Sequence, residues 1–159
     1  MAMTPFRTSC GRGGFTLTEL MAVVTVVGLL SAIAVPKYTD LVRKSREGST
    51  KGNLGTIRSA IRIYYSDNEG RYPTGDLSSL TEASKYVAEF PLAEAANHHS
   101  KTRTVENNDV WGQAGMTTAD SGAWLYWNDQ SLEFSHYRWG DFWIGCTHTD
   151  TQARVWTAY

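Results

Sequence analysis

The sequence lacks the usual features of a disulfide-rich, nucleic-acid-binding or catalytic protein. Its 159 residues include only two cysteines and four prolines, and its formal net charge is −1. A chain so close to neutral has no electrostatic footprint for nucleic acid, which we do not expect as a partner. No Ser/His/Asp set, paired-carboxylate site or phosphate-binding loop stands out, so we expect no enzymatic activity.

The two cysteines, Cys10 and Cys146, are far apart in the sequence. If the segment containing Cys10 is removed as a leader, one cysteine remains and no internal disulfide can form. Cys146 stands among aromatic and β-branched residues, so we expect a buried thiol that packs as a small apolar side chain. With 42% hydrophobic residues, a single domain of this length can be stabilised by its core alone.

One long apolar run is present near the N-terminus, from Leu20 to Val35, and only small or hydroxylic residues interrupt it. Counted from Phe15 to Pro36, the segment has 22 residues and would be about 33 Å long as a helix. The hydrocarbon core of a bilayer is about 30 Å thick, so this helix is long enough to span it.

Three interpretations of this segment compete. A secretory signal peptide could be cut after the A-x-A pattern Ala32-Ile33-Ala34, and a plain membrane anchor would need no cut. The third is a leader peptide followed by a helix that stays in the mature chain. Glu19 favours the third, because a carboxylate inside an apolar span is costly and serves neither of the others.

The stretch GFTLTELM, from Gly14 to Met21, resembles the cleavage and methylation motif of type IV prepilins and type II secretion pseudopilins. The resemblance implies that a prepilin peptidase cuts between Gly14 and Phe15 and that Phe15 is then N-methylated. It also implies that Glu19 is the glutamate required for subunit assembly. The sequence departs from the family at Thr18, where an aliphatic residue is usual, and in a leader of 14 residues that is longer than many.

The residue types suit these roles. Glycine before the cut lets the backbone approach an active site closely. Cleavage would create a charged α-amine on Phe15 at the positive end of a helix dipole, and Glu19 lies one turn further on. The two groups could pair within one helix or between neighbouring subunits, and the second arrangement would set the stagger of a filament.

Pro36 removes one helical hydrogen bond and crowds the preceding turn, so we expect a break or a loosened stretch of helix there. Apolar residues continue at three- and four-residue steps beyond it, which predicts one long helix to about Ser66. These expectations divide the whole chain into four segments: a cytoplasmic leader (1–14), a membrane and polymerisation helix (15–36), an amphipathic continuation (37–66) and a globular head (67–159).

The fold class we expect is α+β and pilin-like, with the long helix packed on a small antiparallel sheet. A short helix is predicted over 78–88. Aromatic and β-branched runs separated by turn residues predict strands at 124–128, 132–137, 142–147 and 153–157.

The sequence also contains residues that could bind a metal ion. His98, His99, His136, Cys146 and His148 contain metal-binding atoms, but their spacing matches no familiar zinc pattern, and we expect no metal.

Major pseudopilins often hold calcium in a loop of the head, and several carboxylates lie in that region: Asp129, Glu133, Asp141 and Asp150. They form no recognisable calcium loop, so calcium is not assigned and no cofactor is expected.

The resulting hypothesis is a structural subunit of a type IV pilus-like filament. Its expected partners are copies of itself, minor pilins, a prepilin peptidase, an inner-membrane assembly platform and membrane lipid. The head would lie on the periplasmic side of the bacterial inner membrane before assembly at the cell surface. A major pseudopilin of type II secretion is the alternative, because YYSDNEGRYPT at the helix end resembles that group. A secreted binding domain released after Ala34 is a more distant one.

Overall fold

The computed structural model describes residues 14–95, 98–108, 119–129 and 137–159. These residues belong to two compact units, which divide the chain at Asp40 and Leu41. The helix α1 (Leu17–Asp67) contributes its first part to one unit and its second part to the other. The predicted long helix is therefore confirmed, with bounds within two residues of those expected.

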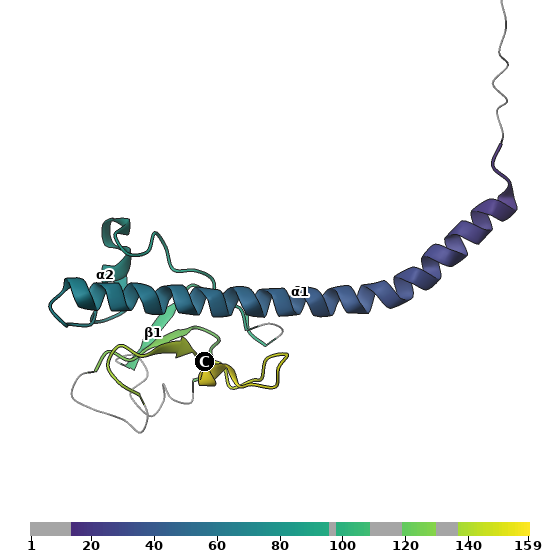
Figure 1. Cartoon of the computed structure of the whole chain (residues 1–159). Coiled ribbons are helices and arrows are strands. Elements are labelled where there is room, and N and C mark those ends of the chain that lie inside the picture. The colour runs from purple at the N-terminus through teal and green to yellow at the C-terminus, as the bar shows by residue number, and fades with distance from the viewer. Residues whose placement is uncertain (1–13, 96–97, 109–118, 130–136) are drawn as a thin grey trace, which may run out of the picture. The chain divides into compact units, whose positions relative to one another are not determined.

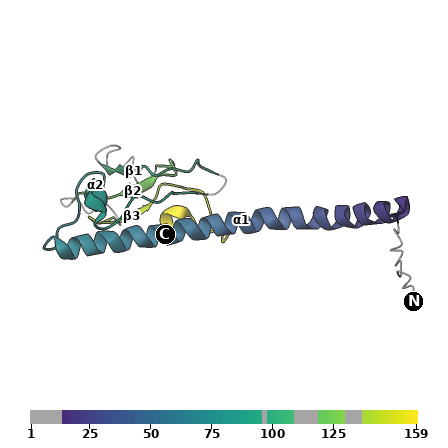
Figure 2. The same ribbon diagram turned by 90° about the horizontal axis from the view of Figure 1, so that it is seen from above.

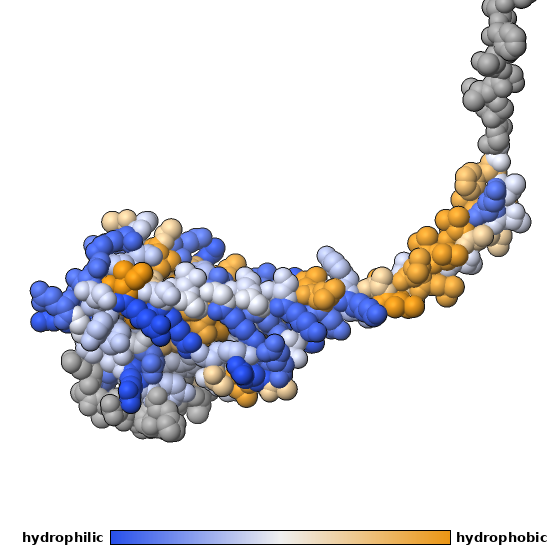
Figure 3. Space-filling model, viewed as in Figure 1, coloured by the Kyte–Doolittle hydropathy of each residue, from blue (hydrophilic) through white to orange (hydrophobic). Residues whose placement is uncertain are grey.

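In the first unit, α1 presents its apolar side chains outward. The large apolar residues from Leu17 to Val35 are all exposed, and Leu29, for example, is 71% exposed. Figure 3 shows this part of the helix as an almost continuous hydrophobic surface. Thr25 donates its hydroxyl to the carbonyls of Met21 and Ala22, so its polar group is satisfied without a partner outside the helix.

Pro36 lies in the interior of α1, and the helix continues through it. The predicted break is therefore not an end of the helix. A loosened turn before Pro36, where the missing N–H leaves one carbonyl without its usual donor, stays a prediction.

The second unit contains the head, which lies alongside the second half of α1 in both ribbon views (Figures 1 and 2). Its sheet has three strands in the order β1 (Val105–Asn107), β2 (Trp124–Tyr126) and β3 (Phe142–Ile144). β2 and β3 are antiparallel, whereas β1 and β2 are parallel. The sheet is therefore mixed, and the purely antiparallel sheet that we predicted is corrected in this respect.

The core forms between one face of α1 and one face of the sheet. Leu54, Ile57 and Ile61 recur at helical spacing and are buried. They share a cluster with Trp124 and Tyr126, which point to the same side of β2. Burying each such side chain contributes about 1.5–3 kcal/mol, so this contact fixes the head on the helix.

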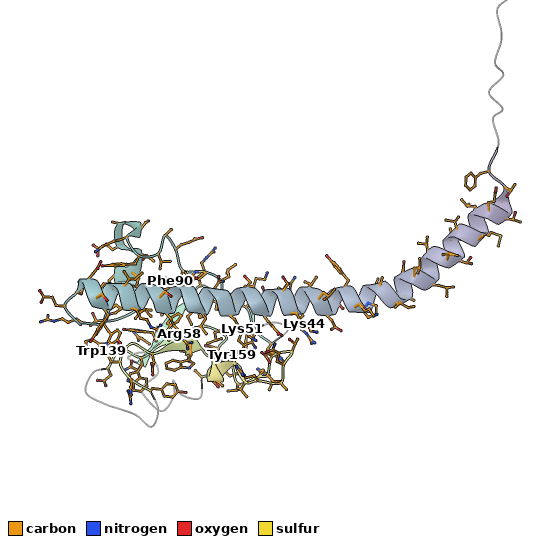
Figure 4. All side chains as sticks on the ribbon, in the orientation of Figure 1. Lys44, Lys51, Arg58, Phe90, Trp139 and Tyr159 are labelled. Atoms are coloured by element: carbon orange, nitrogen blue, oxygen red, sulfur yellow. The ribbon has the colours of Figure 1, made fainter. Side chains whose placement is uncertain are left out.

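A polar contact adds to this packing. Arg58 of α1 donates its Nε–H to the carbonyl of Phe142 in β3, at 2.9 Å. Its side chain crosses from the helix toward the sheet in Figure 4.

The opposite face of the sheet is also covered. Leu125 alternates with its neighbours in β2 and packs with Trp127 and Trp143 in a second cluster, to which Tyr137 adds. The tryptophans that the structure describes are all buried or partly buried. Trp111 lies outside the described residues.

Three predicted elements are shorter than expected, and a fourth is wrong. The helix over 78–88 is reduced to α2 (Ser78–Thr81) followed by the 3₁₀ turn η1 (Glu82–Ser84), because Ala83 and Ser84 adopt left-handed backbone angles. The strands predicted at 124–128 and 142–147 exist but are three residues long.

The segment 153–157 is not a strand. It contains one isolated bridge, between Thr149 and Val155, and then the 3₁₀ helix η2 (Trp156–Ala158). Ala153 has a positive φ of 60°, which ends any extended run. Most of the strand predicted at 132–137 lies outside the described residues.

Candidate processing and assembly site

The predicted cleavage point lies in exposed, irregular backbone just before α1. Residues 14–16 belong to no helix or strand, and Phe15 is 80% exposed. A Cβ added to Gly14 would meet nothing within 4 Å in the described structure. The peptide bond between Gly14 and Phe15 is therefore open to an enzyme that needs an extended backbone and close approach.

Thr16 and Glu19 form a reciprocal cap at the start of α1. The backbone N–H of Thr16 donates to Oε2 of Glu19 at 2.9 Å, and the backbone N–H of Glu19 donates to Oγ1 of Thr16 at 3.2 Å. The hydroxyl of Thr16 also donates to Oε2 of Glu19, at 2.7 Å. This is a capping box, in which two otherwise unpaired N–H groups at a helix start are satisfied.

We did not anticipate this role from the sequence, although Thr-Leu-Thr-Glu fits the S/T-x-x-E signature of the capping box. In the chain described here, Phe15 is joined to Gly14 and has no free amine. The carboxylate of Glu19 is engaged by Thr16. Its pairing with a Phe15 amine, in the same chain or a neighbouring one, stays a prediction.

The first part of α1, which follows the predicted cleavage point, has an apolar and exposed surface. α1 is long and apolar enough to cross a membrane, and none of its most apolar window is buried within the described residues. The core helix of a soluble protein would bury such a window. This part of α1 can therefore contact either lipid or other apolar helices.

A polar network attaches the C-terminal loop of the head to α1. Lys51 donates to the carboxylate of Asp150 at 2.5 Å and to the hydroxyl of Tyr159 at 2.7 Å, and Tyr159 donates to Asp150 at 2.5 Å. The backbone N–H groups of Gln152 and Arg154 donate to the other oxygen of Asp150. Figure 4 shows Lys51 and Tyr159 directed toward each other.

A second carboxylate on α1 holds the same loop. Glu47 is buried and accepts hydrogen bonds from the backbone N–H and the hydroxyl of Thr151. The loop is therefore fixed by two contacts one helical turn apart on α1.

We expect the head to lose stability as the pH falls below about 4. Burial alone would raise the pKa of Asp150, but hydrogen bonds from Lys51, Tyr159 and two backbone N–H groups hold it well below its usual value. Such a group stabilises the fold above its unfolded pKa, about 3.9, and this stabilisation is lost as the pH falls through the folded value. Thermal unfolding followed by circular dichroism between neutral and acidic pH measures it.

The control is Asp150→Asn, which cannot titrate at this position. Its melting temperature should fall less steeply with acidification than that of the natural sequence. Equal slopes for the two proteins would contradict the assignment to Asp150.

The side chains considered as metal ligands are only partly brought together. His99, Cys146 and His148 meet Asp120, a residue that the sequence did not single out. His98 stacks on His148 with ring centroids 4.0 Å apart, and His136 lies outside the described residues.

The calcium candidates do not form a site within the described ranges. Asp150 is engaged by Lys51, and Asp141 accepts a hydrogen bond from the backbone N–H of Arg138 at 2.8 Å. No metal-binding group in the described part of the chain includes Asp129, Asp141 or Asp150, and Glu133 lies outside it.

Cys146 is fully buried in the main core cluster, which confirms its expected packing role. Burial raises the pKa of its thiol to about 11, so the group is neutral at physiological pH.

Comparison with known proteins gives matches over part of the chain. Residues 10–35 match the family described as the prokaryotic N-terminal methylation motif. The fimbrial protein EcpC of Eikenella corrodens is 34% identical over 113 residues, which cover 69% of this chain and 73% of that protein.

Two further relatives are similar over shorter stretches. The type IV major fimbrial protein FimA of Dichelobacter nodosus is 29% identical, with 57% of each chain covered. The type IV major pilin PilE1 of Neisseria gonorrhoeae is 29% identical, covering 63% of this chain and 64% of that protein. The alignments thus span less than two thirds of these two relatives. No solved structure matches the chain significantly.

Proposed function

Because this chain belongs to the type IV pilin family, we propose that it is a subunit of a type IV pilus-like filament that polymerises through the first part of α1. Members of this family are structural proteins and not enzymes. The observation that carries the proposal is the combination of an accessible Gly14–Phe15 bond with an apolar helix surface that the described chain leaves exposed.

The proposal assigns the exposed surface to two successive environments. Before assembly, the apolar part of α1 lies in the inner membrane, with the head on the periplasmic side. In the filament, the same side chains pack against the corresponding helices of other subunits. A surface that is apolar over so many turns suits both environments, since each excludes water.

Cleavage changes the charge at the start of the helix. The new α-amine of Phe15 adds a positive charge beside N–H groups that are already the positive end of the helix dipole. Glu19 is the only acidic residue between Phe15 and Pro36. A neighbouring subunit's Glu19 can therefore neutralise this amine in a water-poor filament core, where an unmatched charge is costly.

The names of the relatives favour a pilus over a pseudopilus of type II secretion, since they are fimbrial proteins and major pilins. The prepilin peptidase, minor pilins and an inner-membrane assembly platform are the further partners that this function requires.

Processing gives the first test of the proposal. Mass spectrometry of the mature protein should find an N-terminus at Phe15 that carries an N-methyl group. Gly14→Val should block cleavage, because a branched side chain prevents close approach of the backbone, whereas Gly13→Ala should be cleaved normally. A mature chain beginning at Val35 would identify an ordinary signal peptide and overturn the proposal.

A further inference from the structure

Four side chains with metal-binding atoms meet at one end of the head sheet. His99 precedes β1, Asp120 precedes β2, and Cys146 and His148 follow β3. Because β1 and β2 are parallel and β3 is antiparallel to β2, the starts of the first two strands and the end of the third lie at the same edge. Segments far apart in the sequence thus contribute to one cluster.

The ligand atoms of these four residues lie close to the separations found around a tetrahedral metal ion. Sγ of Cys146 lies 3.6 Å from Nδ1 of His148, which lies 3.5 Å from Oδ1 of Asp120. Nε2 of His99 lies 3.0 Å from the same Oδ1. With metal–ligand bonds of 2.0–2.3 Å, the edges of a tetrahedron around zinc measure about 3.3–3.6 Å. The four residues offer ligand atoms that all lie within 4.8 Å of one another, so binding requires only the more widely separated atoms to move closer together.

The surroundings hold these ligands in place and leave an approach for an ion. Asp120 is oriented by the backbone N–H of Thr147, which donates to Oδ1 at 2.9 Å. Cys146 is buried, His99 is 15% exposed at its side chain, and His148 is 41% exposed. The site is therefore closed on the thiol side and open on the imidazole side.

The backbone also makes room for one of the ligands. Gly122 has a φ of +73°, and a Cβ at this position would lie 2.3 Å from Cβ of His99. Only glycine combines this backbone conformation with so close an approach.

A plain hydrogen-bond network is the simpler explanation, and it accounts for only part of the arrangement. The His99–Asp120 contact is an ordinary imidazole–carboxylate hydrogen bond. It does not explain why the thiol of Cys146 and a nitrogen of His148 also lie within 4.8 Å of the ligand atoms of His99 and Asp120. Two nitrogen donors, one sulfur and one oxygen are a donor set that zinc accepts well.

We propose that His99, Asp120, Cys146 and His148 bind one zinc ion, which joins three loops at the edge of the head sheet. Binding converts the Cys146 thiol to a thiolate and releases its proton to solvent. The ion would act as a cross-link in a domain that has no disulfide among its described residues. This inference does not depend on the proposed filament function.

The test uses the full chain in detergent micelles, carrying Cys10→Ser so that Cys146 is the sole thiol, after treatment with a chelator. Titration with zinc chloride should reach one ion per chain and raise the melting temperature. Titration with cobalt chloride should give a thiolate-to-cobalt charge-transfer band together with the visible absorption of a tetrahedral Co²⁺ centre.

Variants distinguish the site from surface binding. His148→Gln and Asp120→Asn alter partly exposed side chains and should weaken zinc binding at least about 100-fold, since loss of even an outer partner commonly costs 10–100-fold. His98→Gln, next to the site but outside the ligand set, should bind zinc normally. Absence of the charge-transfer band, or tight zinc binding that survives in His148→Gln, would overturn the proposal.

Discussion

Replacing Glu19 with alanine is expected to leave the chain cleaved and N-methylated but to reduce filament yield at least about tenfold. The physical reason is the unmatched α-amine of Phe15, which would be buried among apolar helices without a counter-charge. Sheared filaments, quantified by electron microscopy and immunoblotting, measure the yield, and mass spectrometry checks the processing. Normal filament yield would contradict the assembly role.

The capping box makes a sharper comparison possible, because Glu19 has a second role within its own chain. Glu19→Gln keeps an oxygen that can accept the Thr16 N–H but removes the charge, since glutamine also serves in capping boxes. If the charge matters, this variant should fail to polymerise as alanine does. If the cap is what matters, glutamine should restore assembly.

Thr16→Ala makes the change opposite to that of Glu19→Gln. It removes the hydroxyl that caps the helix and leaves the charge of Glu19 in place. Loss of such a cap typically costs about 0.5–2 kcal/mol of local helix stability, which a helix of 51 residues can lose without unfolding. We expect this variant to form filaments.

Replacing Asp150 with asparagine is expected to destabilise the head by about 2–4 kcal/mol. The carboxylate is fully buried at its side chain and pairs with Lys51, which is itself only 25% exposed. Removing its charge leaves the ammonium group of Lys51 without a counter-charge. The amide N–H₂ of asparagine then points either toward Lys51 and Tyr159 or toward the backbone N–H groups of Gln152 and Arg154. A domain of this size is stable by about 5–15 kcal/mol, so the loss is a large share.

The measurement is chemical unfolding of the full chain in micelles, followed by circular dichroism. Asp67→Asn is a matched control, because Asp67 also contacts a lysine and its neighbouring tyrosine, Lys85 and Tyr86, but on the surface. Exposed ion pairs contribute little, so its unfolding midpoint should stay close to that of the natural sequence. Equal destabilisation by the two variants would contradict the importance of burial.

Sequence patterns were sufficient to locate the helix and the strands that are marked by long apolar or periodic runs. The helical period from Leu54 to Ile61 placed the core face of α1, and the apolar runs around Trp124 and Phe142 located β2 and β3. β1 was missed because Val-Glu-Asn is short and mostly polar, and its place in the sheet depends on pairing with β2.

The C-terminal segment shows why local pattern can mislead. Val155 and its neighbours have the composition of a strand, but the carboxylate of Asp150 collects the N–H groups of Gln152 and Arg154 into a tight loop. Side-chain capture of backbone donors competes with sheet formation. The sequence does not show that the partly buried Lys51 stabilises the Asp150 carboxylate that makes this capture.

Of the candidate sites, one could be identified from the sequence and the other could not. The cleavage motif is continuous in sequence and could be identified there, as the capping box also could have been. The cluster at the sheet edge could not be identified in this way, because Asp120 lies 21 positions after His99 and only the pairing of three strands brings them together.

Both faces of the head sheet are covered by buried clusters, and each cluster contains tryptophans whose fluorescence can be measured. Trp124 and Trp156 lie in the cluster against α1, whereas Trp127 and Trp143 lie in the cluster on the other face. Each pair of indoles therefore reports on a different layer through its intrinsic fluorescence. Single Trp→Phe substitutions would assign the emission to the two layers and show whether they melt as one cooperative unit or in sequence.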